Sequence, residues 1–138
     1  WLAHDEGGVS RFVRGKRYAV GGMATRRVQC IAAGPNTTLW VGTVDDGVLH
    51  FDGESWTAYT PDDGLLDDYV VDIAVAADGT VWAAVGGGVS RYDGVAWESF
   101  THEDGLASDY VLSVAVGPDG AVWFGTGGGV SRYKPVVR

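Results

Sequence analysis

The chain has 138 residues, of which 46 % are hydrophobic and 20 % are charged, so we expect one domain with a packed core. Its formal net charge of −8 argues against a nucleic-acid binder, because such proteins normally carry a basic stripe. The single cysteine, Cys30, excludes an intrachain disulfide, and no apolar run is long enough to predict a membrane span in this segment.

A repeat of about 41 residues organises the predicted elements along the whole chain. Its anchors are four tryptophans, namely Trp1, Trp40, Trp82 and Trp123. A Gly-Val step follows each anchor, and the segments at 86–92 and 127–133 share the sequence Gly-Gly-Gly-Val-Ser-Arg-Tyr. The recurrence of several anchors in one phase indicates copies of one supersecondary unit that stack on each other.

Each complete unit predicts four short antiparallel strands. In the unit that contains Trp82 these are residues 70–75, 81–85, 89–92 and 97–100, with Asp-Gly pairs as turn signals between apolar runs. The first two strands are almost continuously apolar, which indicates burial on both faces. Trp40, Trp82 and Trp123 recur inside the second of these strands, so we expect them to be core residues. Stacked layers of a solenoid would also bury both faces, but this repeat length suits a propeller blade better. The sequence therefore predicts an all-β fold, a β-propeller arc of four-stranded antiparallel blades.

In chain order, two complete blades are expected between two partial ones, in a single propeller segment over 1–138. The divisions are a partial blade at 1–27 with strands two to four, a blade at 28–60 with a loop at 61–69, a blade at 70–101 with a loop at 102–110, and a partial blade at 111–138. Closed propellers have about four to eight blades. We therefore expect an incomplete ring, which either the remaining blades of a longer protein or copies of this chain would close.

Several motifs resemble the two-component-regulator propeller repeat. They are Asp-Gly-Thr-Val-Trp at 78–82, Asp-Gly-Ala-Val-Trp-Phe-Gly-Thr at 119–126, the Gly-Val-Ser-Arg-Tyr step and the Asp-Gly-Leu loop. The resemblance implies a non-catalytic, ligand-sensing propeller segment of a bacterial receptor or secreted protein, periplasmic or extracellular, with glycans among its ligands. No histidine-kinase or response-regulator segment accompanies the repeats, so a signalling role rests on analogy alone.

The turn at 118–124 is also similar to that of streptogramin lyase-type propellers, whose chemistry uses an axial His/Glu metal site. The three histidines, His4, His50 and His102, fall at different repeat positions and do not match that site. The sequence contains no Gly-x-Ser-x-Gly, no P-loop and no Cys/His pair at liganding spacing. We therefore expect no catalytic residues, no metal site and no cofactor. A protein-interaction scaffold and a lyase-like enzyme remain as alternative functions.

Candidate ligand-binding residues gather in loops that we expect on one rim of the blades. The loops between strands two and three share this rim with the loops that join strand four to the next blade, and a concave site with convergent polar groups is the default binding hypothesis. The candidates in these loops are Arg26, Arg27, Asp45, Asp46, Asp68, Tyr69, Asp109 and Tyr110, and Asp72 is a separate candidate on a strand. Alternatively, these aspartates cap turn amides and the tyrosines pack between blades.

Two sets of candidates depart from their repeat equivalents. Arg26 and Arg27 replace the Asp-Tyr pair of the other units, and such a departure favours a specific role. Asp72 lies on an innermost strand, where the equivalent residues are Cys30 and Ser113. Its carboxylate either faces the central channel or bonds the backbone of a neighbouring blade, and the sequence leaves both open.

Overall fold

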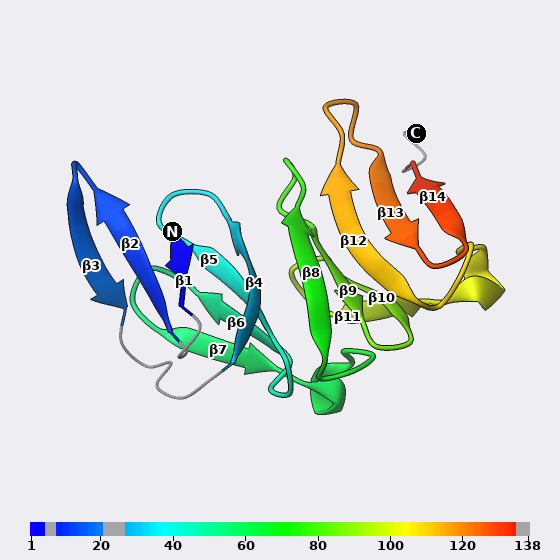
Figure 1. Ribbon diagram of the computed structural model, residues 1–138, viewed down its shortest axis with the longest axis horizontal. Coiled ribbons are helices and arrows are strands. Elements are labelled where there is room, and N and C mark those ends of the chain that lie inside the picture. Colours follow the sequence, from blue (N-terminus) through cyan, green and yellow to red (C-terminus); the bar gives the residue numbers. More distant parts are fainter. Residues whose placement is uncertain (5–7, 21–26, 135–138) are drawn as a thin grey trace.

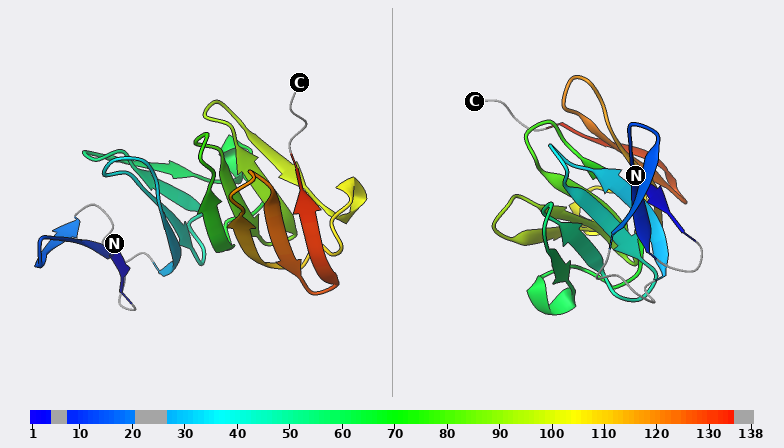
Figure 2. Two further views of the ribbon diagram at one scale, coloured as in Figure 1. Left: turned by 90° about the horizontal axis from the view of Figure 1, so that it is seen from above. Right: turned by 90° about the vertical axis from the view of Figure 1, so that its left-hand side faces the viewer.

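The computed structural model describes residues 1–4, 8–20 and 27–134. These residues form four antiparallel sheets, which follow one another in chain order as an arc that does not close into a ring (Figures 1 and 2). Within the described ranges the helical elements are two short 3₁₀ turns, η1 (Pro61–Asp63) and η2 (His102–Asp104). The predicted all-β propeller arc is therefore confirmed.

The two middle sheets have four strands each, and the described parts of the two terminal sheets have three. The N-terminal sheet contains β1 (Leu2–Ala3), β2 (Val9–Val13) and β3 (Lys16–Val20). The second sheet contains β4 (Val28–Ala33), β5 (Leu39–Thr43), β6 (Val48–Phe51) and β7 (Trp56–Tyr59). The third sheet contains β8 (Val70–Val75), β9 (Val81–Val85), β10 (Gly88–Tyr92) and β11 (Trp97–Phe100). The C-terminal sheet contains β12 (Val111–Val116), β13 (Val122–Thr126) and β14 (Gly129–Tyr133).

The Asp-Gly pairs form turns because the aspartate caps the backbone and the glycine takes a left-handed conformation. Between β10 and β11, the backbone N–H groups of Val95 and Ala96 donate to Asp93 Oδ1 at 2.8 and 2.9 Å. Gly94 in the same turn has a φ of 99°. Asp52 and Gly53 repeat this arrangement between β6 and β7. These backbone bonds hold the pKa of both aspartates below the usual value.

The hydrophobic core consists of layers between successive sheets. Trp40 of the second sheet packs against Tyr92 of the third, with ring centroids 5.9 Å apart. Trp82 of the third sheet packs in the same way against Tyr133 of the C-terminal sheet, at 5.0 Å, and is 3 % exposed. Trp40 and Trp82 are thus each covered by a tyrosine from the following sheet, and Trp1 packs against Phe51 of the second sheet, with ring centroids 6.1 Å apart.

Trp123 corrects one expectation from the sequence. Its place in the repeat predicts a core residue, yet it is 42 % exposed. The physical reason is its position on the C-terminal sheet, where no described sheet follows to cover it. The guanidinium carbon of Arg132 lies 5.6 Å from the centre of its ring.

Candidate functional site

Three equivalent backbone hydrogen bonds bring the candidate loops to one end of the sheets. They run from Val44 N to Arg27 O (3.1 Å), from Gly86 N to Tyr69 O (2.9 Å) and from Gly127 N to Tyr110 O (2.9 Å). Each bond joins the turn between strands two and three to the residue just before strand one of the same sheet. We call this end, formed by residues 43–47, 61–69, 86–88, 102–110 and 127–128, the loop rim.

The β5–β6 turn carries Asp45 and Asp46 on the loop rim. Thr43, which is fully buried, fixes this turn, because its hydroxyl donates to Gly47 O at 2.8 Å and accepts from Asp46 N at 2.9 Å. Asp45 is exposed and Asp46 is half-buried. A buried threonine therefore holds the backbone that presents two carboxylates.

Asp68 and Tyr69 lie in the loop that leads into β8. Tyr69 N donates to Asp67 Oδ1 at 2.7 Å, and Gly47 N donates to Asp68 O at 3.0 Å. A Cβ at Gly86 would lie 2.9 Å from Asp67 Cγ, so a larger residue there would displace the Asp67 side chain. Tyr69 is 43 % exposed on this fixed backbone.

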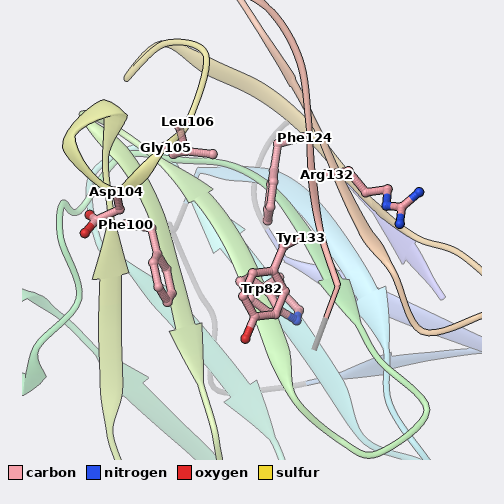
Figure 3. A pocket seen from close by; sticks show the side chains of 8 residues that line it. All are labelled: Trp82, Phe100, Asp104, Gly105, Leu106, Phe124, Arg132 and Tyr133. Atoms are coloured by element: carbon pink, nitrogen blue, oxygen red, sulfur yellow. The ribbon is translucent and has the colours of Figure 1, made fainter. Parts of the chain in front are cut away.

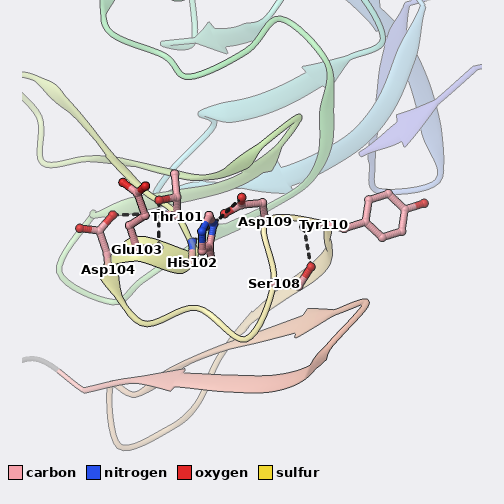
Figure 4. A network of polar contacts seen from close by, with 7 residues as sticks. All are labelled: Thr101, His102, Glu103, Asp104, Ser108, Asp109 and Tyr110. Carbon is pink, nitrogen blue, oxygen red and sulfur yellow. Dashed lines mark hydrogen bonds and ion pairs between the residues drawn. The ribbon is translucent and has the colours of Figure 1, made fainter.

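Asp109 is bound on both carboxylate oxygens by one residue. His102 donates its backbone N–H to Asp109 Oδ1, and its Nδ1 lies 2.6 Å from Asp109 Oδ2 (Figure 4). These bonds, the backbone one first, hold the pKa of Asp109 below its usual value. Tyr110 points away from the pair and is 68 % exposed (Figure 4). Sequence reasoning missed His102, because nothing in the sequence indicates that it folds back onto Asp109.

Asp68 is the repeat equivalent of Asp109 but has different surroundings. The position of His102 is occupied by Pro61, which has no backbone N–H to donate. Asp68 Oδ1 is buried and has no hydrogen-bond partner among the described residues. The repeat position that donates a backbone N–H to Asp109 therefore offers none to Asp68, and Asp68 Oδ1 remains an unused acceptor among the described residues.

Asp72 lies away from the loop rim, on strand β8. Its Oδ2 accepts a hydrogen bond from Val114 N of β12 at 2.9 Å, and its Oδ1 accepts from Ile73 N at 3.0 Å. Of the two arrangements that the sequence left open, the structure thus has the bond to the neighbouring sheet. The carboxylate joins the innermost strands of the third and C-terminal sheets.

The other candidates are distributed unevenly over the loop rim. Asp45, Asp46, Asp68 and Tyr69 lie around the β5–β6 turn and the loop before β8, while Asp109 and Tyr110 lie one sheet further on. Arg27 is exposed at the start of β4, and Arg26 lies outside the described residues. In the described ranges no cluster of three His, Cys, Asp or Glu side chains is arranged to hold a metal ion. No helix there is long and apolar enough to cross a membrane.

Comparison with protein families identifies the repeat type. Residues 105–128 match the family described as two component regulator propeller. This match confirms the resemblance predicted from the motifs. A search of curated proteins finds no match to the chain.

Solved structures with the same fold include extracellular domains named for two component systems and a lyase. An extracellular domain from B. thetaiotaomicron, named for the hybrid two component system BT3049, has a TM-score of 0.79 at 23 % identity over 98 % of this chain and 20 % of its own. The extracellular domain named for the hybrid system BT4673 of the same organism has a TM-score of 0.64 at 25 % identity, over 86 % of this chain and 16 % of its own. Virginiamycin B lyase from Staphylococcus aureus has a TM-score of 0.62 at 13 % identity, over 97 % of this chain and 50 % of its own.

These likenesses establish the propeller fold. The chain spans about a fifth of the length of the BT3049 domain and half that of the lyase. It therefore corresponds to a part of the propellers that it resembles.

Proposed function

We propose that this chain is a ligand-sensing segment of a bacterial extracytoplasmic propeller and that its loop rim binds a glycan. The proposal draws on the two component regulator propeller repeat and on the extracellular sensor domains that share the fold. The rest of the ring would come from further blades of a longer protein. Exposure of Trp123, where Trp82 is covered by the next sheet, supports this part of the proposal.

The observation that carries the binding proposal is the repeated pair of exposed tyrosines on the loop rim. Tyr69 and Tyr110 are 43 % and 68 % exposed, and each follows an aspartate at the same repeat position. The carbonyl oxygens of Tyr69 and Tyr110 accept hydrogen bonds from Gly86 N and Gly127 N, so the backbone that carries each ring is held to the neighbouring turn. An aromatic face stacks on the apolar face of a sugar ring, while carboxylate oxygens accept hydrogen bonds from its hydroxyls.

Titration of the chain with a panel of neutral oligosaccharides tests this proposal. Tyr69→Ala and Tyr110→Ala should each weaken binding about fivefold, since each removes one aromatic contact that is typically worth ~1 kcal/mol. Tyr18→Ala is the matched control, because Tyr18 is 52 % exposed on β3 of the N-terminal sheet, away from the loop rim. Equal affinity of all three variants and the parent chain would refute the rim as the binding site.

A further inference from the structure

The β2–β3 hairpin concentrates positive charge on an acidic protein. Four cations, Arg11, Arg14, Lys16 and Arg17, lie within residues 9–20, which contain no aspartate or glutamate. The equivalent β6–β7 and β10–β11 hairpins, at 48–59 and 88–100, each contain two acidic side chains. The chain as a whole has a formal net charge of −8. The β2–β3 hairpin is therefore a local surface whose charge is opposite in sign to the net charge of the protein.

The cations of this hairpin are not neutralised by neighbouring carboxylates. In the third sheet, Arg91 forms an ion pair with Glu98, which lies directly opposite it on β11. Arg11 is the repeat equivalent of Arg91, but the residue opposite it on β3 is Tyr18. The other three cations are exposed, and within the described ranges none of the four forms an ion pair. Their charge is therefore available to a partner.

The short turn of the hairpin determines which main-chain groups face outwards. Arg14 and Gly15 form this two-residue turn with φ values of 50° and 79°, as a type I′ turn requires. The turn hydrogen bond joins the flanking residues Val13 and Lys16, and bonded and non-bonded pairs then alternate along the ladder. Arg17 lies in the next, non-bonded pair. The backbone N–H and C=O of Arg17 therefore point to the outer edge of β3 rather than to β2.

The outer edge of β3 is open, as are the outer edges of the middle two sheets. β3, β7 and β11 each stand last in their sheets, and no described strand pairs with their outer sides (Figure 1). The open edge thus comes from the position of the fourth strand in a blade. The three edges differ in charge, because β7 has no charged side chain, β11 has Glu98, and β3 has Lys16 and Arg17. Cations on an edge repel basic strands and attract acidic ones.

We infer that the outer edge of β3 binds an extended acidic segment of a partner protein, which pairs with this edge as an added strand. Main-chain hydrogen bonds to the edge would supply affinity, and charge would select the segment. Lys16 and Arg17 point to opposite faces of β3, since successive side chains of a strand alternate. Two successive acidic residues in the partner, one on each face, therefore match them.

The open main chain favours a polypeptide over other anions. Anionic lipids and polysaccharides present negative charge, but they cannot continue the ladder of backbone hydrogen bonds beyond β3. The hairpin at 9–20 contributes no residue to the loop rim, so this inference is independent of the proposed function and can be tested separately.

A synthetic peptide, Thr-Val-Glu-Glu-Val-Thr with blocked ends, tests the inference in either strand direction because its sequence is a palindrome. It should cause saturable shifts of the amide signals of Lys16, Arg17 and Tyr18 in the ¹⁵N-labelled full chain. Replacing both glutamates of the peptide by lysine should abolish binding. Methylation of the two valine nitrogens blocks one amide on each edge of the peptide and should weaken binding about tenfold or more, since main-chain hydrogen bonds are lost. Absence of binding, or equal binding of the methylated peptide, overturns the inference.

Charge-reversal variants of the chain test the site from the other side. Lys16→Glu/Arg17→Glu should weaken binding of the peptide about tenfold or more, because like charges then face each other across the edge. Arg132→Glu/Lys134→Glu is the matched control, with the same change in net charge, and should bind as the parent does. Both of its side chains are exposed, and Arg132 of β14 points away from Tyr133 (Figure 3). Circular dichroism checks that both variants fold. Equal weakening in the two variants would mean that net charge rather than the β3 edge attracts the peptide, and would overturn the inference.

Discussion

At the scale of single residues, one position on the innermost strand shows how neighbouring sheets are joined. Asp72 binds Val114 N of the next sheet, whereas the equivalent Cys30 offers a thiol near the third sheet. Burial, with a smaller contribution from the charge of Asp72, raises the pKa of Cys30 to about 12. The thiol therefore stays protonated at neutral pH and contributes packing rather than charge.

Asp72→Ala should lower the free energy of unfolding by about 1–2 kcal/mol, because it leaves the Val114 N–H without its acceptor in a partly buried place. Asp72→Asn keeps an acceptor oxygen and should lose less. Urea denaturation of both variants measures the difference, with exposed Asp62→Ala as the control. Stability of Asp72→Ala equal to that of the parent would contradict a joining role for this carboxylate.

Equivalent tryptophans should differ in their contribution to stability. Trp82→Ala removes a ring covered by Tyr133 and should cost about 3–5 kcal/mol. Trp123→Ala removes a ring that is 42 % exposed, and should cost about 1 kcal/mol or less. Chemical denaturation of the two variants gives the comparison. Similar losses would mean that Trp123 is covered in solution.

At the scale of elements, the loops at 60–69 and 101–110 begin with the same capping box but differ in the hydrogen bonds of the equivalent Asp68 and Asp109. In both loops a threonine amide donates to an aspartate three residues on, from Thr60 to Asp63 and from Thr101 to Asp104, each at 2.9 Å. This capping box begins η1 and η2 alike. The loops diverge because His102 binds Asp109 whereas Pro61 has no N–H for Asp68.

Acid should therefore loosen the loop at 101–110. The folded-state pKa of Asp109 lies below its unfolded value of about 3.9, so its contribution is complete above about pH 4 and is lost as the pH falls through the folded-state pKa. The amide signal of His102, followed by NMR from pH 6 to pH 2, should move as this bond breaks. Asp109→Asn removes the charge and should abolish that titration. A titration that persists in Asp109→Asn would assign it to another group.

The strands could be predicted from sequence because the same apolar pattern and the same turn residues recur in successive repeats. The predicted strands at 70–75, 81–85 and 97–100 coincide with β8, β9 and β11. The repeat pattern gives every copy of the tryptophan the same core position, and the exposure of Trp123 follows only when the pattern is combined with the open arc that places 111–138 at one end. The partner of Asp109 depends on side-chain geometry in a loop that the repeat does not conserve.

At the scale of the whole molecule, the structure is an arc with a buried layer between each pair of sheets and an uncovered sheet at its C-terminal end. Because the equivalent loops of successive sheets lie at the same end, the exposed Tyr69 and Tyr110 lie on one rim. A ligand that bridges neighbouring blades would contact both Tyr69 and Tyr110. The rim, rather than the opposite turns at 52–55 and 93–96, is therefore the surface on which binding is proposed.

Chemical-shift mapping of an oligosaccharide identified in the panel tests this central claim most directly. The ¹⁵N-labelled chain should show saturable shifts concentrated at Tyr69, Gly86, Tyr110 and Gly127, which the rim hydrogen bonds join in pairs. The signals of the turns at 52–55 and 93–96 should stay unchanged. Shifts concentrated at those turns, or no shifts with any oligosaccharide of the panel, would contradict a glycan-binding loop rim.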